Sequence, residues 1–178
     1  MGARSVQAPP ARGTRMHLRR ARPEDYDAIG TVTLAAYQTQ LNESSSSYAE
    51  HLGNAEARDH QAELWVAVGP DDREVLGTVT VCREGSPWRE VAAADEGEFR
   101  VLAVAPRAQG QGVGEALVRH VLDRFREEGA TAVVLSTNSY GTAPAHRLYQ
   151  RLGFVRCPER DWSPLPGVEL LAYRLELS

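Results

Sequence analysis

The sequence has little cysteine: Cys82 and Cys157 are the only two in 178 residues, and they share no short motif. That usage is typical of a reducing cytoplasm without a disulfide framework. The five histidines show no metal-ligand spacing with cysteine or carboxylate residues, so we expect no metal. No apolar run approaches the roughly 20 residues that a membrane span needs, and the N-terminus lacks the apolar stretch of a secretory signal. These absences predict a cytoplasmic protein without a membrane partner.

What remains is the composition of a globular protein, since 42% of the residues are hydrophobic and 25% are charged. The length predicts a single domain with room for a core, over residues 16–178. Residues 1–15 contain two adjacent prolines and little apolar content, and we expect them to form a flexible N-terminal leader. The net charge of −4 argues against nucleic acid as a partner. A homodimer is left open.

Hydrophobic periodicity predicts alternating strands and helices in the second half of the chain. The expected strands are 16–21, 63–68, 74–84, 97–104, 131–137, 154–157 and 167–177, and the expected helices are 22–41, 47–60, 113–128 and 143–152, with a loop at 85–96. The helix over 47–60 rests on the capping-box spacing of Ser47 and Glu50. Strand–helix alternation implies parallel pairing, flanked here by antiparallel strands. The predicted fold class is therefore a mixed α/β sheet covered by helices.

A glycine-rich turn separates the strand at 97–104 from the helix that follows it. Gly110, Gly112 and Gly114 stand at every second position there. Backbone N–H groups at a helix N-terminus bind anions, and glycines let a bulky phosphate approach them. A dinucleotide-binding G-x-G-x-x-G motif fails, because Glu115 or Leu117 stands where its last glycine belongs. A P-loop fails as well, because no lysine follows the turn.

The pattern that does fit is Gln109-x-x-Gly112-x-Gly114 after the strand residues Leu102-Ala103-Val104. It resembles the coenzyme A pyrophosphate motif of the GNAT superfamily of acyl-CoA-dependent N-acetyltransferases. On this motif alone a purely structural glycine turn stays open. A second family pattern, A-x-x-L-Y-x-x-x-G-F, stands one helix and one strand later as Ala145 to Phe154. The two motifs together identify the chain as a member of that superfamily.

The resemblance implies a GNAT-like fold (α/β, or α+β in some schemes), with a mostly antiparallel central sheet, one parallel pair and helices on both faces. It also implies an acyltransferase with acetyl-CoA as co-substrate and no metal. Donor-binding positions carried over from the family are Leu102, Ala103, Val104, Gln109, Gly110, Gln111, Gly112, Val113, Gly114, Glu115 and Thr142. Many members have asparagine where Thr142 stands, and Asn138 is out of register. The contact from that side chain to the pantetheine arm is therefore an open question.

The family also implies catalytic roles for Tyr149 and Glu98. Tyr149 would be the acid that protonates the leaving thiolate, and packing alone is the alternative. Glu98 matches the spacing of a general base that some members use, and a solvated strand-end carboxylate is the alternative. Neither cysteine stands in a Cys–His arrangement, so direct attack by the amine in a ternary complex is favoured over a covalent intermediate.

The acceptor is a primary amine of a small molecule, a peptide or a protein lysine, and the sequence does not choose among them. Acidic residues in two loops, Asp95, Glu96 and Asp161, are candidates to attract a cationic amine, with Trp88 and Trp162 beside it. Ordinary solvated loops explain the acids equally well. Two other functions stay open: a non-catalytic CoA-binding regulatory module, and a nucleotide-binding protein.

Overall fold

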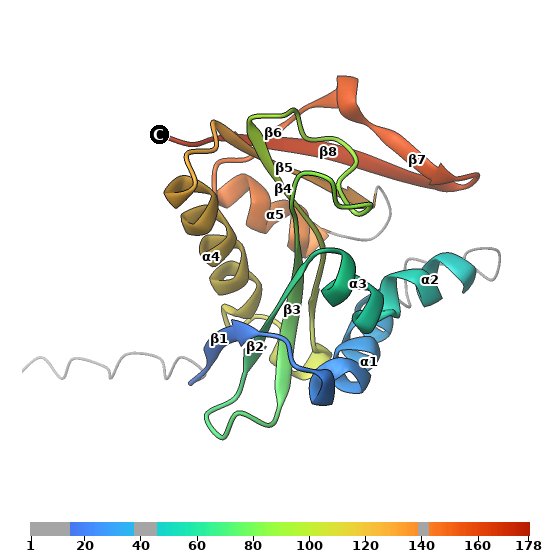
Figure 1. The fold of residues 1–178 in the computed structure, drawn as a ribbon, viewed down its shortest axis with the longest axis vertical. Helices are drawn as coiled ribbons and strands as arrows, with labels where there is room; N and C mark the ends of the chain where they lie inside the picture. The colour runs from blue at the N-terminus through green and yellow to red at the C-terminus, as the bar shows by residue number, and fades with distance from the viewer. Residues whose placement is uncertain (1–14, 38–45, 139–142) are drawn as a thin grey trace, which may run out of the picture.

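A single mixed sheet organises the part of the chain that the computed structural model describes, residues 15–37, 46–138 and 143–178 (Figure 1). The strands are β1 (His17–Arg20), β2 (Glu63–Val68), β3 (Val75–Cys82), β4 (Glu96–Val104), β5 (Ala132–Asn138), β6 (Val155–Arg156), β7 (Trp162–Leu165) and β8 (Val168–Glu176). The helices are α1 (Tyr26–Tyr37), α2 (Ser46–Gly53), α3 (Ala55–Gln61), α4 (Val113–Glu127) and α5 (Ala143–Arg151). None of these helices is long and apolar enough to cross a bilayer.

The sheet has the order β1-β2-β3-β4-β5-β8-β6, and β7 pairs with β8. The β4–β5 pair is parallel, and the other strand pairs of the described sheet are antiparallel. The predicted fold class is confirmed. Strand β7 was not expected as a separate strand, because Pro164 and Pro166 favour a loop there. β7 is a short strand that pairs with β8, and an edge strand tolerates proline, which has no N–H group to donate.

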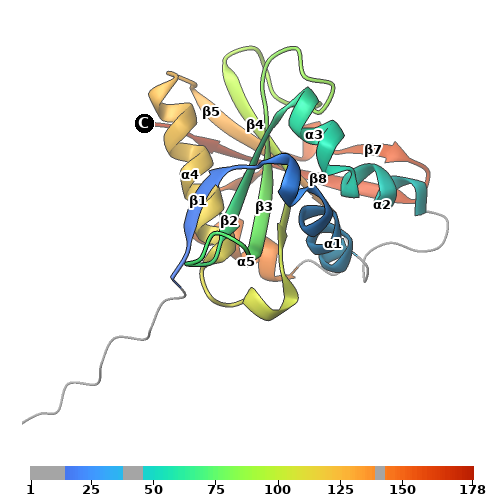
Figure 2. The same ribbon diagram turned by 60° about the horizontal axis from the view of Figure 1, so that its bottom comes forward.

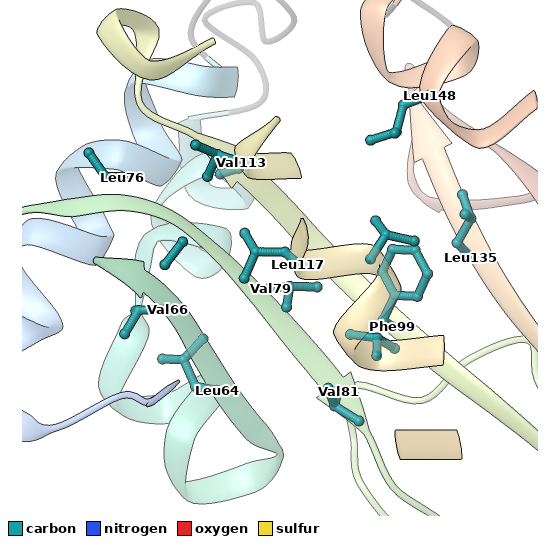
Figure 3. Packing of buried hydrophobic residues seen from close by; sticks show 14 of the residues in the cluster. Leu64, Val66, Leu76, Val79, Val81, Phe99, Val113, Leu117, Leu135 and Leu148 are labelled. Atoms are coloured by element: carbon teal, nitrogen blue, oxygen red, sulfur yellow. The ribbon is translucent and has the colours of Figure 1, made fainter. Parts of the chain in front are cut away.

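Helices cover both faces of the sheet. Figure 2 shows α4 on one side of β2–β4 and α1, α2 and α3 on the other. The apolar stripe predicted for the helix after the glycines is buried along α4 at Val113, Leu117, Val118, Val121, Leu122 and Phe125. In Figure 3, Leu117 lies next to Val79 of β3, and Phe99 extends from the neighbouring strand β4. This packing fixes the N-terminus of α4 at the end of β4.

Glycines in the sheet allow α4 to lie close to it. A Cβ atom added at Gly97 would lie 2.5 Å from the ring carbons of Phe125, and one added at Gly77 would lie 2.8 Å from Val113. Both distances are shorter than van der Waals contact allows. Glycine is therefore required at these two places for α4 to pack as it does.

The helix predicted from Ser47 toward His60 is two helices. Ser47 lies inside α2, and this helix ends at Gly53. Asn54 then caps α3, because its side-chain oxygen accepts a hydrogen bond from the backbone N–H of Ala57 at 3.0 Å. Gly53 and Asn54 thus outweigh the capping-box pattern, since asparagine is among the preferred N-cap residues. Tyr48 and Leu52 of α2 pack with Trp88 in a second apolar cluster.

Candidate active site

Strands β4 and β5 pair only at their beginning. Their register runs from Glu96–Ala132 to Phe99–Leu135 and goes no further, although both strands continue. A β-bulge in β4 lies at this point: Thr80 pairs with Arg100 and Thr78 with Ala103, so two residues of β4 face one of β3. Val101 in the bulge has φ of +55°, a rare conformation for a β-branched residue. The strands consequently diverge, as a pantetheine arm paired to β4 would require.

Two adjoining pockets occupy the gap between the diverging strands. They share Tyr37, Arg100, Val101, Ser136 and Thr137. One, the α5-side pocket, is completed by Ala36, Phe99, Leu102, Ala145 and Tyr149. The other, the α2-side pocket, is completed by Tyr48, Leu52, Asn138 and Leu170. Because they share five residues, the two pockets lie side by side.

The predicted glycine turn lies between β4 and the N-terminus of α4. Gly110 and Gly112 have φ of +74° and +83°, and Gly112 is the N-cap of α4. A Cβ atom added at either position would meet nothing within 4 Å, so the space beside both residues is open. The first N–H groups of a helix have no acceptor within the helix. The turn therefore fits a pyrophosphate, which would occupy the space that side chains would otherwise fill.

The remaining predicted donor-binding residues are distributed around this turn and the gap. Leu102 lines the α5-side pocket, whereas Ala103 and Val113 are buried. Glu115, in the first turn of α4, forms salt bridges with Arg119 and Arg151 that would offset its charge if an anion were bound at the turn. Thr142 is outside the described residues.

Tyr149 lines the α5-side pocket from α5. Its ring packs against Phe99, Phe154 and Tyr173 with centroids 5.8 to 6.3 Å apart. Its residue is 4% exposed, and burial raises the pKa of its phenol above the ordinary value. The hydroxyl therefore keeps its proton at neutral pH and can donate a hydrogen bond, although the raised pKa makes it a weaker acid than an exposed tyrosine.

Glu98 is fully buried on β4 and lines neither pocket. Its Oε2 accepts hydrogen bonds from the backbone N–H groups of Glu90, Val91 and Ala92 at 2.9 to 3.0 Å, and its Oε1 has no partner among the described residues. Burial raises the pKa of Glu98, although the three N–H groups act in the opposite direction. The carboxylate thus anchors the loop before β4, and its role as a base stays a prediction.

Two of the three acids expected to attract a cationic acceptor form salt bridges within the protein. Glu96 is 8% exposed and forms salt bridges with Arg160 and Arg174. Burial alone would raise its pKa, but hydrogen bonds from these two arginines lower it to about 2. Asp161 forms a salt bridge with Arg156, and Asp95 accepts a hydrogen bond from Thr131. None of the three acids lines either of the two pockets described above, so their role in attracting the acceptor stays a prediction.

The two tryptophans expected beside the acceptor instead flank a residue of the chain. The guanidinium carbon of Arg100 lies 5.8 Å from the ring centroid of Trp88 and 5.1 Å from that of Trp162. Arg100 is 7% exposed and lines both pockets. The sequence did carry a signal for it, because it is the one cation within the apolar strand at 97–104.

Neither cysteine is placed for covalent catalysis. Cys82 is buried, lines neither pocket, and has its thiol pKa raised by burial. Cys157 contacts Glu159 at 2.8 Å, and burial together with that carboxylate raises its thiol pKa as well. A thiolate is therefore disfavoured at both positions. Within the described ranges, no three potential ligands among histidine, cysteine and acidic residues cluster to hold a metal.

Curated relatives of the chain are acetyltransferases. It is 32% identical over 134 residues to a mycothiol acetyltransferase of Cellulomonas flavigena. The aligned residues are 67% of this chain and 38% of that protein. The chain is 35% identical over 103 residues to the streptothricin acetyltransferase of Streptomyces lavendulae, which covers 58% of this chain and 50% of that protein. The aligned part of the chain spans half or less of the length of these two relatives.

The fold is shared with solved acetyltransferase structures. The PaiA N-acetyltransferase of Thermoplasma acidophilum, crystallised in complex with coenzyme A, superposes with a TM-score of 0.69 at 14% identity, over 92% of this chain and 99% of that one. A family model described as the acetyltransferase (GNAT) family matches residues 24–154, most of the domain. The chain belongs to the GNAT family of acetyltransferases.

Proposed function

We propose that the protein transfers an acetyl group from acetyl-CoA to a primary amine by direct attack while both substrates are bound. The observation that carries this proposal is the gap between β4 and β5, where the α5-side and α2-side pockets share a wall. A donor in the first and an acceptor in the second would meet beside Arg100 and Val101. Holding two reactants in contact in this way removes much of the entropic barrier to reaction.

The donor would be held by main-chain groups. The turn from Gln109 to Glu115 would bind the pyrophosphate at the N-terminus of α4. The unpaired edge of β4 at Leu102, Ala103 and Val104 would pair with the pantetheine arm as an added strand does. Thr142 would stand where many relatives of the family place an asparagine.

Tyr149 would donate its proton to the departing sulfur of CoA. A thiol with a pKa of about 8.5 leaves more readily when a hydrogen-bond donor offsets the charge that develops on it. The tyrosine suits this role because its hydroxyl is neutral and lies in the wall of the α5-side pocket.

The acceptor amine must lose a proton before it attacks. An alkyl ammonium with a pKa of about 10.4 is roughly one part in 2,500 neutral at pH 7. Glu98 is the proposed base, and because it lines neither pocket it would take the proton through a water molecule.

If Glu98 is the base, Glu98→Gln should lower the rate of acetyl transfer and move the pH–rate profile toward alkaline pH. A lower melting temperature with an unchanged profile would leave Glu98 with the loop-anchoring role alone.

A thiol-release assay over a broad panel of amines tests the function. The panel contains amino acids, their amides, short peptides, polyamines and streptothricin, with mass spectrometry to detect the acetylated product. We expect at least one acceptor to release CoA well above the rate of acetyl-CoA hydrolysis. If no acceptor does so while CoA still stabilises the protein against heat, a CoA-binding module is the better description.

A further inference from the structure

Arg100 places a buried guanidinium in the wall shared by the two pockets. Its guanidinium donates two long hydrogen bonds, both 3.4 Å, to the carbonyl oxygen of Trp88 and the hydroxyl of Tyr48. It forms no salt bridge within the described ranges, although the residue is 7% exposed. A guanidinium has five N–H groups in a planar fork that matches a carboxylate. Most of that donor capacity is therefore available on the pocket wall.

A second buried arginine lies behind it. Arg58 is 0% exposed and donates to the hydroxyls of Thr80 at 3.2 Å and Thr33 at 3.0 Å, while its Nε has no partner in the described structure. Thr80 is the direct cross-strand partner of Arg100, and paired residues project to the same face of a sheet. Two guanidinium groups without a carboxylate partner thus share one face at the gap.

No other titratable group of the described residues forms a salt bridge with Arg100. Glu98, two residues along the same strand, interacts with its charge at longer range, while the Oε2 of Glu98 accepts hydrogen bonds from three backbone N–H groups. Burial raises the pKa of Tyr37 to about 12, and it also raises the pKa of Tyr48, so both are neutral. Burial lowers the pKa of His51, which is stacked on Trp88, so the neutral imidazole is favoured there. Glu90, in the loop before β4, is exposed to solvent.

We infer that Arg100 binds a carboxylate of the acceptor, so that the acceptor is a small amine with a carboxylate within a few bonds, as in a free amino acid. This deepens the proposed function and rests on it. The short separation follows from the place of Arg100 in the wall shared by both pockets, next to the point where amine and thioester would meet. The N-terminus of a peptide has an amide in place of that carboxylate, and a lysine within a protein has none nearby.

The two tryptophans suit this role. The indole faces of Trp88, in the loop after β3, and Trp162, at the start of β7, hold the guanidinium by cation–π contacts and shield it from water. Trp162 is itself fixed by a hydrogen bond from its Nε1 to the hydroxyl of Ser136, which is also in the shared wall. A hydrogen-bonding group held in this way discriminates strongly against an acceptor that lacks the complementary oxygen atoms.

The test compares each amino acid with its own amide, in which the amine is kept and the carboxylate is removed. For the preferred side chain, kcat/KM should be about 30-fold higher for the amino acid, the size expected of a charge-assisted hydrogen-bond pair. Arg100→Met should abolish the preference, mainly through KM, with the Kd of CoA unchanged. Arg100→Lys should restore part of it, since it keeps the charge but loses the fork. Arg126→Met, on the exposed face of α4, is the control and should change nothing.

Binding separates this inference from the proposed function. Titration of CoA-bound protein with N-acetylamino acids and with their amides measures the subsite without turnover. Tighter binding of the carboxylate forms, lost in Arg100→Met, supports the inference even if no acceptor is acetylated. If amines are acetylated but amides are used as well as amino acids, the proposed function stands and this inference falls. The wild-type comparison decides the matter even if Arg100→Met does not fold.

Discussion

Gly112→Val is expected to raise the Kd of acetyl-CoA by about 100-fold or more, a loss of roughly 2.7 kcal/mol. A Cβ atom added at Gly112 meets no protein atom within 4 Å. The branched side chain would therefore clash with the ligand rather than with the protein. Isothermal titration with acetyl-CoA and with CoA measures the effect.

The backbone conformation of Gly112 requires a matched control, because valine is strained at its φ of +83° by about 1–3 kcal/mol. Gly85 supplies that control: its φ is also +83°, a Cβ atom there also meets nothing within 4 Å, and it lies in the loop after β3. Gly85→Val should lose similar thermal stability and bind acetyl-CoA normally. Equal affinity of the two variants for acetyl-CoA would contradict the binding of the pyrophosphate at this turn. If Gly112→Val does not fold, Gly110→Ala provides a milder version of the same test.

Tyr149→Phe is expected to lower kcat about 100-fold, within the range usual for loss of a general acid, with little change in KM. The ring stays, so its packing on Phe99 and Phe154 is kept, and only the proton donor is removed. Because burial raises the pKa of Tyr149, the wild-type hydroxyl is protonated through the neutral range and should produce no alkaline limb there. Steady-state thiol release with the best acceptor provides the measurement.

Tyr173→Phe is the control for that experiment. Tyr173 is 4% exposed, belongs to the same aromatic cluster and lines neither pocket. It should keep kcat within about threefold of the wild type, as most substitutions outside the reacting groups do. A similar fall in both variants would mean that Tyr149 acts through packing rather than by proton transfer.

The sequence predicted correctly those elements that are determined by residues close together in the chain. The apolar stripe of α4 and the glycine turn before it depend on spacing within one segment, and both were found as expected. The α2–α3 break was missed because two local signals competed, and the capping strength of Asn54 outweighed the Ser47 pattern. Strand β7 was missed because its pairing with β8 overrides the preference of Pro164 for a loop.

The candidate site depended on contacts that no single segment contains. The divergence of β4 from β5 needs the bulge at Val101, which is visible only in the pairing with β3. Likewise, the neutralisation of Glu96 comes from Arg160 and Arg174, more than 60 residues away in the chain. Without those partners, Glu96 looked like a candidate to attract a cationic amine, and Arg100 was overlooked.

If the donor binds between β4 and β5 as proposed, the separation of these strands would also couple folding to metabolism. The donor would then supply the strand that the middle of the sheet lacks, and every molecule of bound CoA would add to the stability of the native state. Protein without CoA or acetyl-CoA would open locally at this place first, and proteases would cleave it there sooner. The amount of intact enzyme in a cell would then rise and fall with the supply of its own acetyl donor.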